Sequence, residues 1–226
     1  MNWSEVARLG QVRLNLGGGA DCHPDPHYQR YVSVDFEPTT AWSVQHDLTQ
    51  PIPLPEGSVE RILSEHCLEH LDAVTAAKVF AECHRLLVPG GLLRVAVPDY
   101  GSPRNRAFRD RGFDPNHTDH KIFPTYPLMR ELVSASPFGA GHFYQYWDGE
   151  RFVHGAIDYS LGWVKRTVEH DRRNRCDGLG RLAVRTLRDA AFLISRGFRA
   201  SRNELLTQRY HPLRMTSIVI DLRKNG

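Results

Sequence analysis

The chain has 226 residues, of which 41% are hydrophobic and 24% charged, which is typical of a globular domain that can bury a core. The net charge of +3 is too small to indicate a nucleic-acid partner, and no apolar run approaches the roughly 18 residues of a membrane-spanning helix. The first ten residues lack a signal-peptide pattern and the four cysteines form no CxxC pair. We therefore expect a cytoplasmic protein with reduced thiols and with no membrane or nucleic-acid partner.

Short apolar runs alternate with a helical pattern in the first half of the chain. Strands are predicted at 12–16, 31–36, 42–48, 59–66 and 92–99. After the fourth of these, Asp72 can cap a helix that runs to about Leu87, because apolar residues recur there at steps of three or four and VPGG follows. Strands that alternate with helices predict a parallel sheet covered on both faces.

The second half of the chain is less regular. A long polar loop is predicted at 100–127, helices at 126–136 and 178–197, and a last strand at 215–224. The arginine-rich segment 165–188 is either a solvated helical face or a surface for an anionic substrate or a second subunit, which would make a homodimer. We expect one domain over 1–226, with a cofactor-binding half at 12–99, an acceptor-binding and lid region at 100–214 and the last strand at 215–224.

Three consecutive glycines, Gly17, Gly18 and Gly19, follow the first predicted strand. Glycines let the backbone come close to a ligand, and ligands of α/β sheets bind at the carboxyl ends of the strands. The continuation Ala20–Pro24 lacks the third spaced glycine of a dinucleotide fingerprint and the Gly-Lys-Ser/Thr of a P-loop. The glycines therefore indicate a ligand loop that is neither of these.

Acidic residues end the next two predicted strands. A carboxylate at Asp35 can accept hydrogen bonds from both hydroxyls of a ribose, and one at Asp47 can accept a proton from an adenine amino group. A glycine loop followed by these two acids describes a nucleoside site without a phosphate clamp.

Four stretches carry a resemblance to a known family: "LNLGGG", "VSVDFEP", "HDLTQPIPLPEGSVERILSEHCLEHL" and "LLVPGGLLRVAVPD". Over about residues 12–99 the chain resembles class I S-adenosylmethionine-dependent methyltransferases of type 11. The resemblance implies S-adenosylmethionine as cofactor and an α/β, Rossmann-like, doubly wound sheet of seven strands. The last strand would be antiparallel, and a loop-rich and helical insertion would bind the acceptor.

The resemblance also implies which residues bind the cofactor. The glycines would approach its methionine part, Asp35 its ribose, and Asp47 with Leu48 its adenine. Ser64, Glu65 and His66 would lie beneath the sulfonium. The full implied set is Asn15, Gly17, Gly18, Gly19, Asp35, Phe36, Asp47, Leu48, Ser64, Glu65 and His66. Asn15 departs from the family, which usually has an acid at this position.

Methyl transfer to a hydroxyl needs a base, or a metal that lowers the pKa of the hydroxyl. The candidate bases are His117, Asp119, His120, His142 and Asp99. His120 ranks high because relatives often carry histidine at this place ahead of a helix. His117 and His120 could instead hold a metal with Asp119 or Asp99, but Mg²⁺ prefers oxygen ligands and is not favoured.

Glu69 and His70 lie inside the predicted start of a helix, and we expect no catalytic role for them. Eight aromatic residues between 138 and 163 suit the apolar face of a sugar ring, although they could equally form the core of an insertion or a dimer interface. Together with the histidine-rich loop they favour a hydroxylated acceptor.

The chain also resembles bacterial sugar methyltransferases. The predicted function is therefore O-methylation of a sugar or oligosaccharide, including a mannoside, in polysaccharide or glycoside biosynthesis. The alternatives are a small-molecule N-, C- or carboxyl-methyltransferase and a catalytically degenerate cofactor-binding protein, which Asn15 would support.

Overall fold

The structure is a computed structural model, in which we describe residues 1–170, 179–201, 204–205 and 217–226. The two first residues of the predicted strand 215–224, and residues 171–178 of the arginine-rich segment, lie outside these ranges. Within the described ranges no helix is long and apolar enough to cross a membrane.

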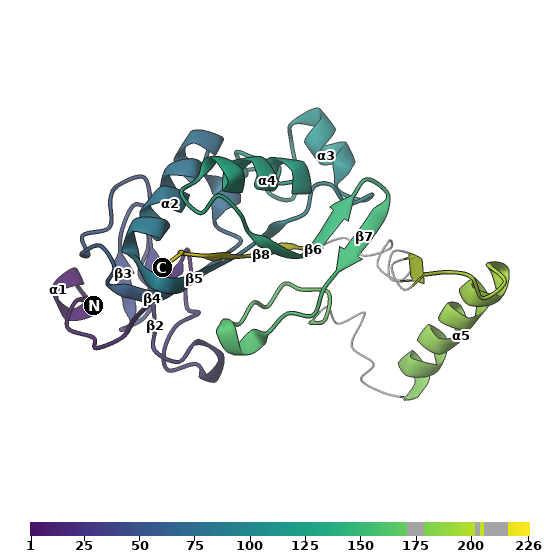
Figure 1. Ribbon diagram of the computed structural model, residues 1–226, viewed down its shortest axis with the longest axis horizontal. Coiled ribbons are helices and arrows are strands. Elements are labelled where there is room, and N and C mark those ends of the chain that lie inside the picture. Colours follow the sequence, from purple (N-terminus) through teal and green to yellow (C-terminus); the bar gives the residue numbers. More distant parts are fainter. Residues whose placement is uncertain (171–178, 202–203, 206–216) are drawn as a thin grey trace.

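An eight-stranded sheet forms the centre of the molecule (Figure 1). Its strands are β1 (Val12–Leu16), β2 (Tyr31–Asp35), β3 (Ser43–Gln45), β4 (Val59–Glu65), β5 (Leu87–Pro98), β6 (His142–Asp148), β7 (Arg151–His154) and β8 (Ser217–Arg223). They are arranged in the order β3-β2-β1-β4-β5-β8-β6-β7. The first five strands of this order are parallel, whereas β8 runs antiparallel to β5 and β6.

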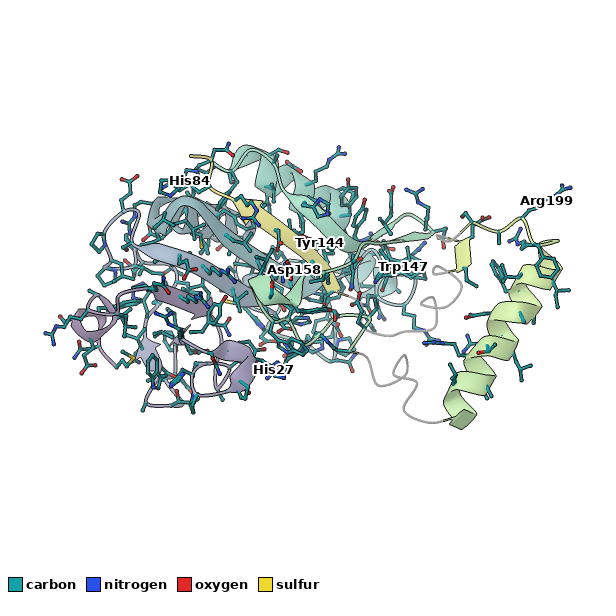
Figure 2. The ribbon with its side chains drawn as sticks, turned by 60° about the horizontal axis from the view of Figure 1, so that its bottom comes forward. His27, His84, Tyr144, Trp147, Asp158 and Arg199 are labelled. Atoms are coloured by element: carbon teal, nitrogen blue, oxygen red, sulfur yellow. The ribbon has the colours of Figure 1, made fainter. Side chains whose placement is uncertain are left out.

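The antiparallel last strand is confirmed, but the expected number of seven strands is wrong. The additional edge strand is β7, which forms an antiparallel hairpin with β6. This hairpin is built from the aromatic stretch of the sequence. Trp147 and Phe152 are buried between its strands and Val168, and Figure 2 shows Trp147 within the main body. Burial of these large rings is the reason that the segment pairs as strands instead of forming a loop.

Helices α2 (Ala73–Leu86) and α4 (Tyr126–Ala135) lie side by side on one face of the sheet (Figure 1). Asp72 caps α2 as predicted, because its carboxylate accepts the Thr75 N–H at 2.9 Å. The buried side chains of α2 follow the predicted helical spacing: they are Ala76, Val79, Phe80, Cys83 and Leu86. The VPGG segment belongs to β5, which begins directly after α2 and therefore starts five residues earlier than predicted.

The opposite face of the sheet is covered by irregular segments with two 3-10 helices, η1 (Pro26–Tyr28) and η3 (Tyr159–Leu161). Tyr28 and Trp163 pack there against Tyr31 and Leu63 of the sheet. A third 3-10 helix, η2 (Leu68–His70), follows β4. The remaining helices are α1 (Trp3–Val6), α3 (Arg106–Arg111) and α5 (Leu179–Ser195).

Helix α5 stands apart from the sheet, as Figure 1 shows, and Arg199 lies beyond its end in Figure 2.

In the centre of the sheet, Arg94 of β5 and Asp221 of β8 form a buried pair with two hydrogen bonds, of 2.7 and 2.8 Å. The N–H groups of Arg94 also reach the carbonyl oxygens of Asp158 and Gly162. This pair therefore fastens the irregular cover to the sheet.

Candidate active site

A pocket of about 350 Å³, here called the cofactor pocket, lies at the carboxyl ends of β1, β2 and β4. Several residues of the implied cofactor set line it, namely Gly17, Asp35, Phe36, Asp47, Leu48 and His66. Its other lining residues are Val34, His46, Cys67, His70 and Leu71. The parallel strands bring these side chains together because their carboxyl ends meet at one edge of the sheet.

The glycine loop is tied closely to the neighbouring strands. Gly17 has a φ of +64°, and a Cβ atom there would lie 2.7 Å from the side chain of Cys67. Its N–H donates to the Val34 carbonyl at 2.8 Å, and the Gly19 N–H donates to the Asp35 carboxylate at 2.9 Å. The loop thus needs glycine at position 17 for its backbone conformation and for space.

Asn15 is buried beneath this loop and does not line the pocket. Its Nδ2 donates to the Asp21 carbonyl at 2.8 Å, and a Cβ on Gly18 would lie 2.7 Å from the same atom. Asn15 therefore supports the loop with an uncharged amide, where the family usually has an acid.

Asp47 also lines the pocket and is exposed, and the N–H of Thr49 holds the pKa of its carboxyl below the usual range.

Ser64 and Glu65 also lie outside the pocket lining. Ser64 is buried, whereas the Glu65 carboxylate accepts the backbone N–H groups of Lys165 and Arg166 at 3.0 and 2.6 Å. Burial raises the pKa of Glu65. Glu65 thus holds a segment that is one hundred residues away in sequence, instead of offering its oxygens to the pocket.

His66 joins the cofactor pocket to the centre of the sheet. Its backbone N–H donates to the Ala96 carbonyl at 2.8 Å, and its Nε2 lies 3.0 Å from the Ser217 hydroxyl. Its Nδ1 lies 3.4 Å from a carboxylate oxygen of Glu69. Burial lowers the pKa of His66 to about 3, so that the ring is neutral at pH 7.

A second pocket, of about 570 Å³ and here called the loop pocket, lies beyond the end of β5. It is lined by Pro98, Tyr100, Arg104, Asn105, Phe108, Asp114, Asn116 and His117. Most of these residues belong to the polar loop that was predicted at 100–127. His117, a predicted base, is half-buried in its wall.

A group of side chains, here called the histidine cluster, lies between the two pockets. It consists of Glu69, His70, Tyr100, Asp114, His117, Asp119 and His120. The His117 and His120 rings are stacked with their centroids 4.7 Å apart, and the His120 ring meets His70 edge-on at 4.9 Å. Since His70 lines the cofactor pocket while Tyr100 and His117 line the loop pocket, the cluster connects the two.

The environment of Glu69 differs from that expected of a residue at the start of a helix. Glu69 and His70 belong to η2, before α2 begins, and the Glu69 side chain is 0% exposed. Neither of its carboxylate oxygens has a hydrogen-bond partner among the described residues. Burial raises the pKa of Glu69 to about 8. A buried carboxyl group whose oxygens make no hydrogen bond is costly, and such a group indicates a functional position.

Tyr100 and Asp114 were not predicted as site residues. The Tyr100 hydroxyl donates to Asp114 at 2.9 Å and lies 2.7 Å from His120 Nδ1, and burial lowers the pKa of His120 to about 4. A repeated Glu-His pair, at 65–66 and 69–70, was the available signal for Glu69 and His70. No comparable pattern marks Tyr100 or Asp114.

Two predicted bases lie elsewhere. Asp99 is buried, and its two carboxylate oxygens accept the backbone N–H groups of Gly101 and Trp147 at 2.8 and 2.7 Å, so it offers no free oxygen to a substrate. His142 pairs with Asp221, which lies opposite Arg94 in β5. That position is four residues before the end of β5, or about 13 Å from the edge of the sheet that carries the pockets.

The aromatic stretch does not form an open wall. None of its eight rings belongs to an exposed residue, and Phe138, Trp147 and Phe152 are fully part of the core. Tyr144 is held by Asp221, and Tyr146 stacks on Tyr126 with centroids 4.0 Å apart. The alternative that these rings form the core of an insertion therefore fits better than the sugar-binding wall.

Comparison with known proteins agrees with the geometry. Residues 17–95 match the family described as "Methyltransferase domain". Over 113 residues the chain is 31% identical to a Mycolicibacterium smegmatis protein named "Probable S-adenosylmethionine-dependent methyltransferase", of whose length it spans 41%.

Two solved structures share the fold. A methyltransferase from Archaeoglobus fulgidus is similar with a TM-score of 0.55 at 12% identity, over 98% of this chain and 90% of that one. The phosphoethanolamine N-methyltransferase 2 of Haemonchus contortus, in complex with S-adenosylhomocysteine, is similar with a TM-score of 0.52 at 13% identity, over 96% of this chain and 50% of that one. At 12% and 13% sequence identity, these similarities show only that the fold is shared.

Proposed function

Since the chain carries a class I S-adenosylmethionine-dependent methyltransferase domain, we propose that it transfers the methyl group of that cofactor to a hydroxyl of a polar acceptor, such as a sugar or oligosaccharide. The histidine cluster carries the proposal, because it places ionisable groups between a cofactor pocket and a second, polar pocket. The acceptor would occupy the loop pocket. A small-molecule acceptor of another class is the alternative, and the acceptor panel described below distinguishes the two.

The residues of the cofactor pocket fit the cofactor. The backbone of Gly17 offers close approach without a side chain, Asp35 offers its carboxylate to the ribose, and Asp47 lies where the adenine amino group would be. When bound, S-adenosylmethionine supplies a methyl group on a positively charged sulfur. The neutral His66 at the inner end of the pocket adds no opposing charge to that sulfur.

His117 is proposed to take the proton of the acceptor hydroxyl. It is the predicted base that lines the loop pocket, and its ring is held in place by stacking on His120. His120 is less suitable, because its side chain is only 3% exposed and its Nδ1 is engaged with Tyr100. Asp119 lies 3.1 Å from His70 Nδ1 and does not line the loop pocket.

The test is methyl transfer from labelled cofactor to a panel of oligosaccharides and of non-sugar amines, acids and alcohols. We expect label in hydroxylated acceptors, and a fall in kcat of about 10²- to 10⁴-fold for His117→Ala. His142→Ala is the matched control and is expected to keep the wild-type rate. Label that appears only in non-sugar acceptors would contradict the proposed sugar acceptor. A lack of S-adenosylhomocysteine binding in calorimetry would contradict the proposed methyltransferase activity.

The cytoplasmic location, the single domain over 1–226 and the homodimer stay predictions from the sequence. The exposed Leu182, Val184, Leu187 and Ile194 of α5 are a surface on which a second copy could pack. Size-exclusion chromatography with light scattering tests this part of the proposal.

A further inference from the structure

Three possible ligands converge inside the histidine cluster. Glu69, His70 and His120 each present one ligand atom, and these atoms lie within 4.8 Å of one another. The backbone fixes this arrangement, because the Glu69 carbonyl accepts the N–H groups of Lys121 and Ile122 at 2.8 and 3.2 Å. The loop that carries His120 is therefore fastened directly to η2.

The hydrogen bonds of His120 determine which of its nitrogens is free. The single hydroxyl proton of Tyr100 is donated to Asp114, so the Tyr100 oxygen must accept from Nδ1–H of His120. In the neutral ring the lone pair is then on Nε2. That atom lies 3.9 Å from Oε1 of Glu69, which is too far for a direct hydrogen bond.

His70 is the third member of this group. Its Nδ1 lies 3.1 Å from the carboxylate of Asp119, so the two form a close pair when that nitrogen carries a proton. Glu69, neither of whose carboxyl oxygens makes a hydrogen bond to a described residue, thus lies fully buried beside the rings of His70 and His120. A bound cation would give these buried oxygens the partner that the described residues do not supply.

We propose that Glu69, His70 and His120 bind a divalent transition-metal ion of the Zn²⁺ type. Two imidazoles and one carboxylate are a ligand set of such ions and leave a coordination position open. The Tyr100 hydroxyl, which donates to Asp114, engages Nδ1 of His120 and so leaves Nε2 of that ring for the ion, and Asp119 lies 3.1 Å from Nδ1 of His70. Metal–ligand distances of about 2.0–2.1 Å place two donors about 3.3 Å apart, so the separations between the ligand atoms would shorten by up to about 1.5 Å.

The ion would lie between the two pockets, because His70 lines the cofactor pocket and Tyr100 lines the loop pocket. A hydroxyl that reaches the open position would have its pKa lowered. A catalytic role of the ion rests on the proposed methyl transfer, whereas the binding of the ion does not depend on it. Experiments can therefore refute metal binding and methyl transfer independently of each other.

The test uses the untagged full chain, stripped with EDTA and dialysed. Calorimetric titration with Zn²⁺ is expected to show one ion per chain. Co²⁺ in the same protein is expected to show visible d–d bands without a thiolate charge-transfer band, because the ligands are nitrogen and oxygen. His70→Ala and Glu69→Gln should lower the affinity by at least about tenfold to a hundredfold, while the matched control His142→Ala should bind as wild type.

Far-ultraviolet circular dichroism and S-adenosylhomocysteine binding check that each variant is folded. His70 is partly exposed, so His70→Ala keeps the test decisive even if Glu69→Gln unfolds. The proposal is overturned if the wild type takes up no Zn²⁺ at micromolar concentration, or if folded His70→Ala binds it as tightly as wild type. If the protein binds S-adenosylhomocysteine but no Zn²⁺, the metal site is refuted and the proposed methyl transfer is not.

Discussion

The backbone N–H of Gly19 donates to Oδ2 of Asp35 across 2.9 Å, although sixteen residues separate them in the chain. Asp35 therefore does two things at the end of β2. It closes the glycine loop over the cofactor pocket, and it presents the same carboxylate to that pocket.

Asp35→Ala is expected to weaken S-adenosylhomocysteine binding by about 10- to 100-fold, because hydrogen bonds to a charged group are worth about 1.5–3 kcal/mol. Isothermal titration calorimetry measures the change. Asp110→Ala, which removes an exposed carboxylate on α3, should leave the affinity unchanged. Equal affinities for the two variants would show that Asp35 is not a cofactor ligand.

Gly17→Ala and Gly57→Ala form a matched pair, since both glycines have a φ of +64°. A Cβ at Gly57 meets no atom within 4 Å. The free energy of unfolding of this variant should therefore fall only by about 1–2 kcal/mol, the cost of a left-handed backbone conformation for alanine. At Gly17 the clash with Cys67 should add about 1–3 kcal/mol and weaken cofactor binding. Urea unfolding of both variants gives the two free energies, and equal losses would contradict the close packing of the loop.

Asp221→Ala should destabilise the fold by about 3–5 kcal/mol, because it leaves Arg94 buried without its partner. The matched control is Asp148→Ala, whose pair with Arg151 is exposed and 3.8 Å long. It should cost at most about 1 kcal/mol. Urea unfolding monitored by circular dichroism measures both, and similar losses would mean that the Arg94–Asp221 pair contributes no more than a surface pair.

His66 gives stability a defined dependence on pH. Its pKa falls from 6.5 in the unfolded chain to about 3 in the fold, so between these values the unfolded state binds a proton that the native state does not. The stability from this group is complete above pH 6.5 and is lost as the pH falls toward 3. His66→Asn, which tolerates the positive φ of this position, removes the effect.

We therefore expect the free energy of unfolding of the wild type to fall faster than that of His66→Asn, by about 1.4 kcal/mol per pH unit between about pH 6 and pH 4. Urea unfolding in the presence of EDTA measures both curves. His142→Asn, at an exposed position, should follow the wild type. Parallel curves for wild type and His66→Asn would mean that His66 is not held neutral.

Local patterns predicted most of the elements. β1 and α2 have their predicted bounds to within a residue, because periodic apolar residues, a capping Asp72 and the glycines act within a few positions of themselves. The β6–β7 hairpin was missed, since its strands are stabilised by packing against β8 and Val168, which are distant in sequence. Strand pairing of this kind is decided by the partner as much as by the segment itself.

The sequence by itself determined the glycine loop, the acids at the ends of β2 and β3 and the kinship of residues 17–95, because these features are encoded in short contiguous motifs. The tertiary structure decided which ionisable side chains lie near the pockets and are not already engaged in hydrogen bonds. It gives both oxygens of Asp99 to backbone amides, places His142 away from the pockets, and buries the carboxyl group of Glu69 without a hydrogen bond to a described residue, beside His70 and His120. The physical reason is that desolvation and hydrogen-bond satisfaction depend on neighbours brought together by folding, and no spacing within one segment records them.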